Sequence, residues 1–192
     1  MNDREIITGL IQGESSAFEY IWENYSTRIY NFICCNVKFD YDMADDILQD
    51  VFLHCLKKAD QFNFKAKLST WMFSIAYKKC CKSFRNARKT VSLTYDFEQD
   101  KNEEIELPSG ENHDPEKKIL WKQALNKYRK SLNALNKKQR IAWVLHKEQG
   151  LSHDEISEIL NQSPNSCRIL VSRAKKALLE LIGVNSLNEI AY

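Results

Sequence analysis

Nowhere does this 192-residue sequence contain the run of about 18 consecutive apolar residues that a membrane-spanning helix requires. Its first ten residues, MNDREIITGL, carry charges where the signal peptide of a secreted protein would have its apolar segment. The sequence therefore indicates neither a membrane protein nor a secreted one. We expect a cytoplasmic protein with no direct membrane insertion.

The sequence also lacks the usual motifs of enzymes and metal sites. It contains no HExxH motif, no Gly-rich phosphate loop and no nucleophile elbow. The cysteines form no CxxC pair, and adjacent helical positions do not easily chelate one metal ion. The six are Cys34, Cys35, Cys55, Cys80, Cys81 and Cys167. We predict reduced, half-buried thiols, and no metal, cofactor, small-molecule substrate or catalytic residue. The alternative, an enzyme that uses His146, His153 and the cysteines, is disfavoured by the missing motifs.

Charge is distributed unevenly, although the formal net charge of the chain is only +2. The segment from Gln61 to Tyr95 contains eight Lys and Arg residues and no acidic residue. The next stretch, from Asp96 to Glu116, contains nine acidic residues and a single lysine. The two blocks average to near neutrality, while each creates a strong local field.

The acidic stretch has the composition of a mobile linker. It contains Pro108 and Pro115 and has no apolar periodicity. On either side of it the apolar residues recur at helical spacing, and the Asn-Gly and Asp-Gly pairs of β-hairpins are absent. The sequence therefore predicts an all-α fold with two small helical domains joined by an acidic flexible linker. We expect no shared core, and limited proteolysis should cut between Asp96 and Glu116.

The first half contains the pattern of a helical bundle. One apolar stripe runs over residues 18–33, and a second runs over residues 44–55 after Asp42 as a plausible N-cap. A short segment over residues 60–67 leads to a third helix, predicted from about Ser69 to Asn86. Three or more amphipathic helices make a compact bundle.

The second half contains the local signals of a helix-turn-helix. Asn136 can cap a helix that Gly150 would close, and residues 152–155 (SHDE) form a capping box at the start of a short helix. After a turn, Ser163 supplies another cap, with Pro164 at the first helical position. Two short helices joined by a tight turn, the second of them basic, are typical of a DNA-binding helix-turn-helix domain.

The basic block combines cations with aromatic rings as a surface for unpaired DNA would. The spacing places Trp71 and three cations within about forty degrees of one line along the predicted third helix. Bases of an unpaired strand stack on aromatic faces while lysines follow the phosphates. The residues of this ridge and of the loop before it are Phe62, Asn63, Phe64, Lys65, Lys67, Trp71, Lys78, Lys82 and Arg85. The alternative is a solvated basic helix whose aromatic residues belong to the core.

A polar acidic face is predicted on the second helix. Asp46, Gln49 and Asp50 are spaced i, i+3 and i+4, next to the buried stripe. A partner helix with basic residues could dock on this face. The residues alone favour the alternative, an ordinary solvated helix surface.

The order of these motifs resembles the extracytoplasmic-function (ECF) group of bacterial RNA polymerase sigma factors. Similarity to region two of that family lies in residues 45–52 (DDILQDVF), 60–62 (DQF) and 68–76 (LSTWMFSIA). Similarity to region four lies in residues 135–140 (LNKKQR), 150–160 (GLSHDEISEIL) and 172–178 (SRAKKAL). A lone helix-turn-helix is a weak signal, whereas both regions in the family's order are a strong one.

The resemblance implies a protein without catalytic chemistry that directs promoter-specific initiation of DNA-templated transcription. Such a protein binds core RNA polymerase, melts the minus-ten element and reads the minus-thirty-five element. The implied domains are a region-two-like bundle over 1–95, an acidic linker over 96–118 and a region-four-like helix-turn-helix domain over 119–192. The linker would follow a polymerase channel otherwise used by RNA. The implied partners are core RNA polymerase, promoter DNA in double- and single-stranded form, and an anti-sigma factor.

The resemblance also gives each set of residues a role. Asp46, Gln49 and Asp50 would contact the clamp helices of the largest polymerase subunit, and the aromatic and basic residues of 62–85 would hold the melted minus-ten strand. The residues for the minus-thirty-five element are Ser163, Asn165, Ser166, Arg168, Arg173 and Lys176.

The chain departs from the family pattern in its recognition helix. Many relatives carry a basic residue in place of Leu170 and a glycine in place of Asn161. Asparagine tolerates the left-handed turn, so we expect the fold to survive. We expect Leu170 to remove one phosphate contact that a basic residue at this position could make.

A two-domain DNA-binding regulator that is not a polymerase subunit is a further alternative. Such a regulator has no need of a stackable, basic surface for single-stranded DNA. Binding to core polymerase in the absence of DNA separates the two interpretations.

Overall fold

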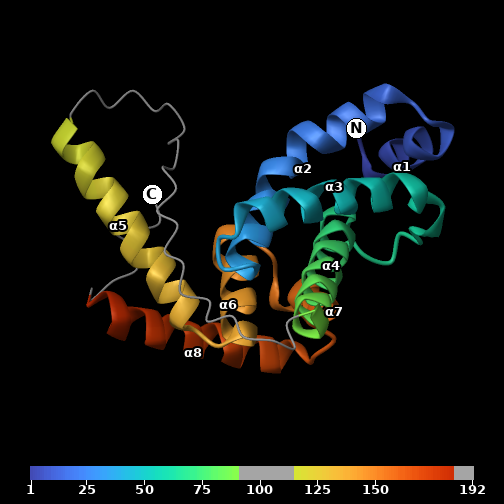
Figure 1. Cartoon of the computed structure of the whole chain (residues 1–192). Coiled ribbons are helices and arrows are strands. Elements are labelled where there is room, and N and C mark those ends of the chain that lie inside the picture. The colour runs from blue at the N-terminus through green and yellow to red at the C-terminus, as the bar shows by residue number, and fades with distance from the viewer. Residues whose placement is uncertain (91–114, 184–192) are drawn as a thin grey trace.

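The computed structural model describes residues 1–90 and 115–183, and both described parts consist of helices without a β-strand (Figure 1). The predicted all-α fold is confirmed. Most of the predicted linker lies outside the described residues, although its last residues, 115–118, are helical. No helix in the described part is both long and apolar enough to cross a membrane. The elements are α1 (Asp3–Gln12), α2 (Ser15–Asn36), α3 (Tyr41–Lys57), the 3-10 turn η1 (Ala59–Gln61), α4 (Leu68–Thr90), α5 (Pro115–Ala134), α6 (Lys137–Trp143), the π-helical segment η2 (Val144–Glu148), α7 (His153–Leu160) and α8 (Pro164–Ile182).

Helices α1 to α4 form the predicted bundle in the first half. Their apolar faces meet in a core in which the rings of Phe32 and Phe73 pack edge to face, with centroids 5.4 Å apart. Helix α3 begins two residues earlier than expected, because Asp40 and not Asp42 accepts the hydrogen bond that caps it, from the Met43 backbone N–H at 3.0 Å. Helix α1 was not predicted.

The caps predicted in the second half are present. Asn136 accepts from the Gln139 backbone N–H, and Ser152 and Glu155 form a complete capping box at the start of α7. Ser163 caps α8, whose first residue is Pro164. These local hydrogen bonds fix where α6, α7 and α8 begin, and the last two of these helices form the helix-turn-helix.

The two halves pack against one another. Figure 1 shows α7 beside α4, and the buried apolar residues of both halves belong to one connected core. Polar contacts join them as well: the guanidinium of Arg28 donates to the Gln149 carbonyl oxygen at 2.8 Å. The expectation of halves without a shared core therefore differs from the structure. The linker composition on which it rested carries no information about contacts between the helices on either side.

Candidate nucleic-acid interface

The loop between η1 and α4, residues 62–67, carries two aromatic rings in different environments; we call it the aromatic loop. Phe62 is buried, with 6% of its surface exposed, whereas Phe64 is 45% exposed. The two rings lie 4.9 Å apart between centroids, and the Phe62 ring lies 5.2 Å from that of Trp71. The loop turns at Asn63, whose side-chain oxygen accepts from the Lys65 backbone N–H at 3.1 Å. Phe64 is thus the ring of this loop that solvent or a base can reach.

A hollow of about 300 Å³ opens beside the aromatic loop. Its walls include Asn63, Lys65, Trp71 and Lys78, all of which belong to the predicted minus-ten set. Glu158 of α7 also lines it, and no motif in the sequence places that residue there. The aromatic, amide and cationic groups of the hollow therefore suit a base and its phosphate. The carboxylate of Glu158 does not, because it would repel the phosphate.

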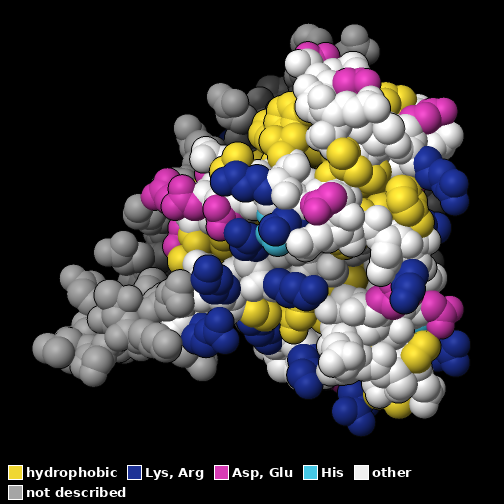
Figure 2. Space-filling view, turned by 90° about the vertical axis from the view of Figure 1, so that its right-hand side faces the viewer, with side chains coloured by type: hydrophobic (Ala, Val, Ile, Leu, Met, Phe, Trp, Pro, Cys, Tyr) yellow, Lys and Arg dark blue, Asp and Glu magenta, His cyan; other side chains and the backbone are white. Residues whose placement is uncertain are grey.

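The basic ridge of α4 is present as predicted. Lys78, Lys82 and Arg85 are exposed, and Trp71 is half-buried at the loop end of the ridge. Figure 2 shows Lys and Arg side chains gathered across the middle of this face of the molecule. The buried position of Phe62 matches the alternative in which one of these aromatics belongs to the core, and it leaves Phe64 and Trp71 as the accessible rings.

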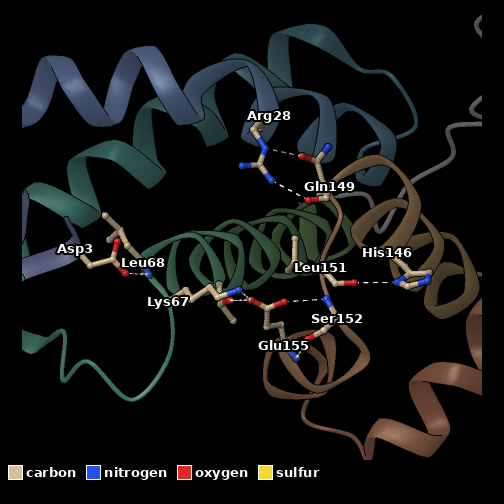
Figure 3. Close-up of polar contacts among 10 residues, drawn as sticks. Asp3, Arg28, Lys67, Leu68, His146, Gln149, Leu151, Ser152 and Glu155 are labelled. Carbon is tan, nitrogen blue, oxygen red and sulfur yellow. Dashed lines mark hydrogen bonds and ion pairs between the residues drawn. The ribbon is translucent and has the colours of Figure 1, made fainter. Parts of the chain in front are cut away.

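Helix α7 is held against the aromatic loop by Glu155 (Figure 3). The Glu155 Oε1 atom lies 3.0 Å from the Lys67 ammonium and accepts from the Thr70 hydroxyl at 3.4 Å. Its Oε2 atom accepts from the Ser152 backbone N–H at 2.8 Å, which caps α7. Burial alone would raise the pKa of Glu155, but the hydrogen bonds from Ser152 and Lys67 outweigh it and lower the pKa. One carboxylate thus serves both the α7 cap and the contact between the halves.

The acidic face of α3 is exposed at Asp46, Gln49 and Asp50, as predicted. Asp50 Oδ2 accepts from the Lys79 ammonium of α4 at 2.9 Å. Both members of this pair are partly or largely exposed, so solvent screens the interaction and a competing cation could replace Lys79. No local pattern predicts this pairing, because the two residues are 29 positions apart.

Helix α8 presents its basic side to solvent. Arg168, Arg173 and Lys176 are exposed, as is Asn165 near the helix start, and Ser163 and Ser166 are engaged in the cap. Asn161 adopts the left-handed conformation at φ 51°, which confirms that it serves in place of glycine at the turn. Leu170 packs partly against the core. Its inward position gives a physical reason for an apolar residue there.

The cysteines and histidines form no site in the described part of the chain. All six thiols are free, and five of them are buried; burial raises the pKa of Cys55 and of Cys80 to about 12. Among the described residues, no group of three or more His, Cys, Asp or Glu side chains could hold a metal ion. His146 Nδ1 lies 2.9 Å from the Leu151 carbonyl oxygen, and its ring is tilted against that of His153. These two histidines help to shape the segment before α7.

Comparison with known proteins assigns both halves of the chain to one family. Residues 22–90 match the model of sigma-70 region 2, and residues 125–178 match that of sigma-70 region 4. The chain belongs to the ECF group of the sigma-70 family. Members of this family direct promoter-specific initiation of transcription, and they are transcription regulators rather than classical enzymes.

Curated RNA polymerase sigma factors match over most of this chain. SigW of Bacillus subtilis is 28% identical over 87% of this chain and 89% of its own length. CarQ of Myxococcus xanthus, an RNA polymerase sigma factor, is 25% identical over 89% of this chain and 92% of its own length. BldN of Streptomyces coelicolor is 24% identical over 93% of this chain, which spans 65% of BldN.

Two solved structures share the fold. The sigma factor RpoE from Bartonella quintana, in complex with the anti-sigma factor NepR, has a TM-score of 0.67 and 22% identity; the match covers 88% of this chain and 98% of RpoE. CnrH, in complex with the cytosolic domain of CnrY, has a TM-score of 0.69 and 18% identity, over 96% of this chain and 99% of CnrH.

Proposed function

We propose that this ECF sigma factor divides promoter recognition between two surfaces with different physical properties. The aromatic loop and the α4 ridge hold the melted minus-ten strand, and the exposed basic side of α8 reads the minus-thirty-five duplex. The observation that carries the proposal is the half-exposed Phe64 ring beside the hollow lined by Trp71 and Lys78. A stacking surface of this kind has value only for unpaired bases.

The proposal for α8 follows from its exposed donors. Arg168 and Arg173 project from a capped helix of 19 residues that is long enough to lie in the major groove. Arginine pairs in a bidentate manner with guanine or binds phosphates, and Asn165 is placed near the helix start, where base edges are contacted. The sequence of the element depends on which of these donors meet bases.

Core RNA polymerase is the proposed partner of the α3 face. Asp46, Gln49 and Asp50 are exposed on one side of a well-anchored helix, and Asp50 already pairs with a lysine. A basic partner helix could take over that pairing. We also propose an anti-sigma factor as a partner, since the two solved neighbours were captured in complexes with NepR and with CnrY. The chain would act in the cytoplasm, without catalysis, and with domains over 1–95 and 119–192 joined by the acidic linker.

Promoter binding requires α7 to leave the aromatic loop. In the structure, Glu155 forms an ion pair with Lys67, and Glu158 lines the hollow proposed for the strand. A DNA phosphate placed there would be repelled by both carboxylates. We infer that the packed arrangement is that of the free chain and that the two halves separate on the polymerase.

The decisive experiment is binding to purified core RNA polymerase without DNA, followed by run-off transcription from a genomic library. Saturable binding and initiation at discrete start sites are expected. A two-domain regulator that is not a polymerase subunit would bind duplex DNA but would neither bind core enzyme nor start transcripts, and that result would overturn the proposal.

A further inference from the structure

We propose that Asp3 and Arg4, at the start of α1, are positioning residues for the minus-ten strand. They hold the aromatic loop in the shape that exposes Phe64. The inference rests on the proposed function of that loop. Both residues lie before residue 22, where the match to sigma-70 region 2 begins.

Asp3 fixes the end of the aromatic loop. Its Oδ2 atom accepts from the backbone N–H of Leu68, the first residue of α4, at 2.9 Å (Figure 3). The first N–H groups of a helix have no partner within the helix, and a carboxylate is favoured there by the helix dipole. Asp3 is therefore an N-terminal cap for α4 supplied by a residue 65 positions away. It ties the first residue of α4, directly after the loop, to α1.

Arg4 holds the middle of the same loop. Its guanidinium carbon lies 5.6 Å from the centroid of the Phe64 ring, within cation–π range. Phe64 has a φ of 57°, a left-handed conformation that a residue with a bulky side chain rarely adopts. Such a conformation persists only where the surroundings hold it. The Phe64 ring contacts Arg4 of α1 and packs against Phe62 within the loop, and both contacts help to hold it in place.

Helix α1 is a firm base for both contacts. A complete capping box between Asn2 and Glu5 fixes its first turn, and Ile6, Ile7 and Leu10 are buried against the bundle. The side chains of Asp3 and Arg4 therefore project from a rigid element and not from a loose terminus. Rigid support of this kind lowers the entropy that a binding loop loses when its ligand arrives.

Arg4 leaves the Phe64 ring accessible. The residue remains 45% exposed with the Arg4 guanidinium over its ring, so a base could stack on the exposed part of the ring with that positive charge close by. The loop is thus ordered before the strand arrives. The structure assigns to α1 a part in capturing the unpaired strand.

The test compares variants assembled with core enzyme on a promoter that carries an artificial bubble over the minus-ten element. Arg4→Gln removes the cation, and Arg4→Lys keeps it without the planar guanidinium. Asp3→Asn removes the capping charge at nearly constant shape, and Lys138→Gln is the matched control, since it removes an exposed cation from the other half. We expect Arg4→Gln to weaken binding to the bubble by about two- to fivefold, with Arg4→Lys in between. Asp3→Asn should weaken it as well, and the control should not.

A double variant shows whether Arg4 acts through Phe64. If it does, adding Arg4→Gln to Phe64→Ala should cause little further loss, because the contact is already absent. Full additivity would mean that Arg4 binds DNA by itself, and it would overturn the positioning role. Normal binding by both the Arg4→Gln and Asp3→Asn variants, with Phe64→Ala impaired, would refute this inference alone. Normal binding by Phe64→Ala would instead refute the proposed function of the loop.

Discussion

Removing the charge of Glu155 should open the contact between the two halves. Glu155→Gln keeps the shape of the side chain and can still complete the α7 cap, since glutamine also serves at that position of a capping box. It removes the ion pair with Lys67, in which the ammonium nitrogen lies 3.0 Å from the carboxylate oxygen. The lysine side chain of this pair is 74% exposed. Glu155 is only 19% exposed, but the open lysine end lets solvent screen the pair, so we use the value typical of surface pairs, about 0.2–1 kcal/mol. The ratio of packed to open molecules should therefore fall by about 1.4- to 5-fold.

The assay is binding of a fluorescently labelled single-stranded oligonucleotide of mixed sequence to the free chain, because stacking on aromatic rings tolerates most sequences. When the packed form dominates, the apparent affinity rises by the same factor as the fraction of open molecules. Glu155→Gln should therefore bind the strand more tightly than the unaltered chain. Glu180→Gln, on the exposed side of α8, removes an equal charge away from the contact and serves as the control.

Helix content measured by circular dichroism should be the same for both variants. Affinity that is unchanged for Glu155→Gln, or that rises equally for Glu180→Gln, would refute the reasoning. The first result would mean that α7 does not compete with the strand. The second would mean that the general negative charge of the chain, and not the Glu155 contact, limits binding.

The other predictions concern the remaining surfaces. Trp71→Ala should impair strand opening and recover only in part on a bubble template, whereas Arg173→Ala should weaken duplex binding and, if its contact is to phosphate, reduce the salt slope by about one unit; equal defects on both templates would reject the two-surface assignment. Asp50→Lys combined with Gln49→Ala should weaken binding to core polymerase while thermal unfolding shifts little, because both residues are exposed; unchanged core affinity would remove them from the interface. The pKa of Glu155 is lower in the folded chain than its ordinary value of 4.5, so its contribution to stability is present above pH 4.5 and is lost as the pH falls through the folded pKa. Unfolding followed between pH 6 and pH 3 should therefore show a smaller acid destabilisation in Glu155→Gln.

Local patterns in the sequence were sufficient to predict the helix-turn-helix. The caps at Asn136, Ser152 and Ser163 bind backbone groups only three residues away, so the residue types and their spacing determine them. Misplacing the α3 cap at Asp42 has the same origin, because Asp40 and Asp42 both fit the local pattern. Only the course of the backbone before the helix distinguishes them.

The exposure of the candidate site residues could be predicted where one helix presents them together. Lys78, Lys82 and Arg85 share a face of α4 by periodicity alone, and they are exposed in the structure. The exposure of the loop residues could not be predicted from the sequence in the same way. Burial of Phe62 and exposure of Phe64 depend on how the loop turns and on what α1 and Trp71 place against it.

The sequence by itself determined the helices, their caps and the separation of charge, because each depends on residues within one or two helical turns. Tertiary structure decided which surfaces meet. Leu68 receives its cap from Asp3 across 65 positions, and Thr70 meets Glu155 across 85. Contacts at such separations depend on the packing of whole helices, and no local pattern of residues encodes them.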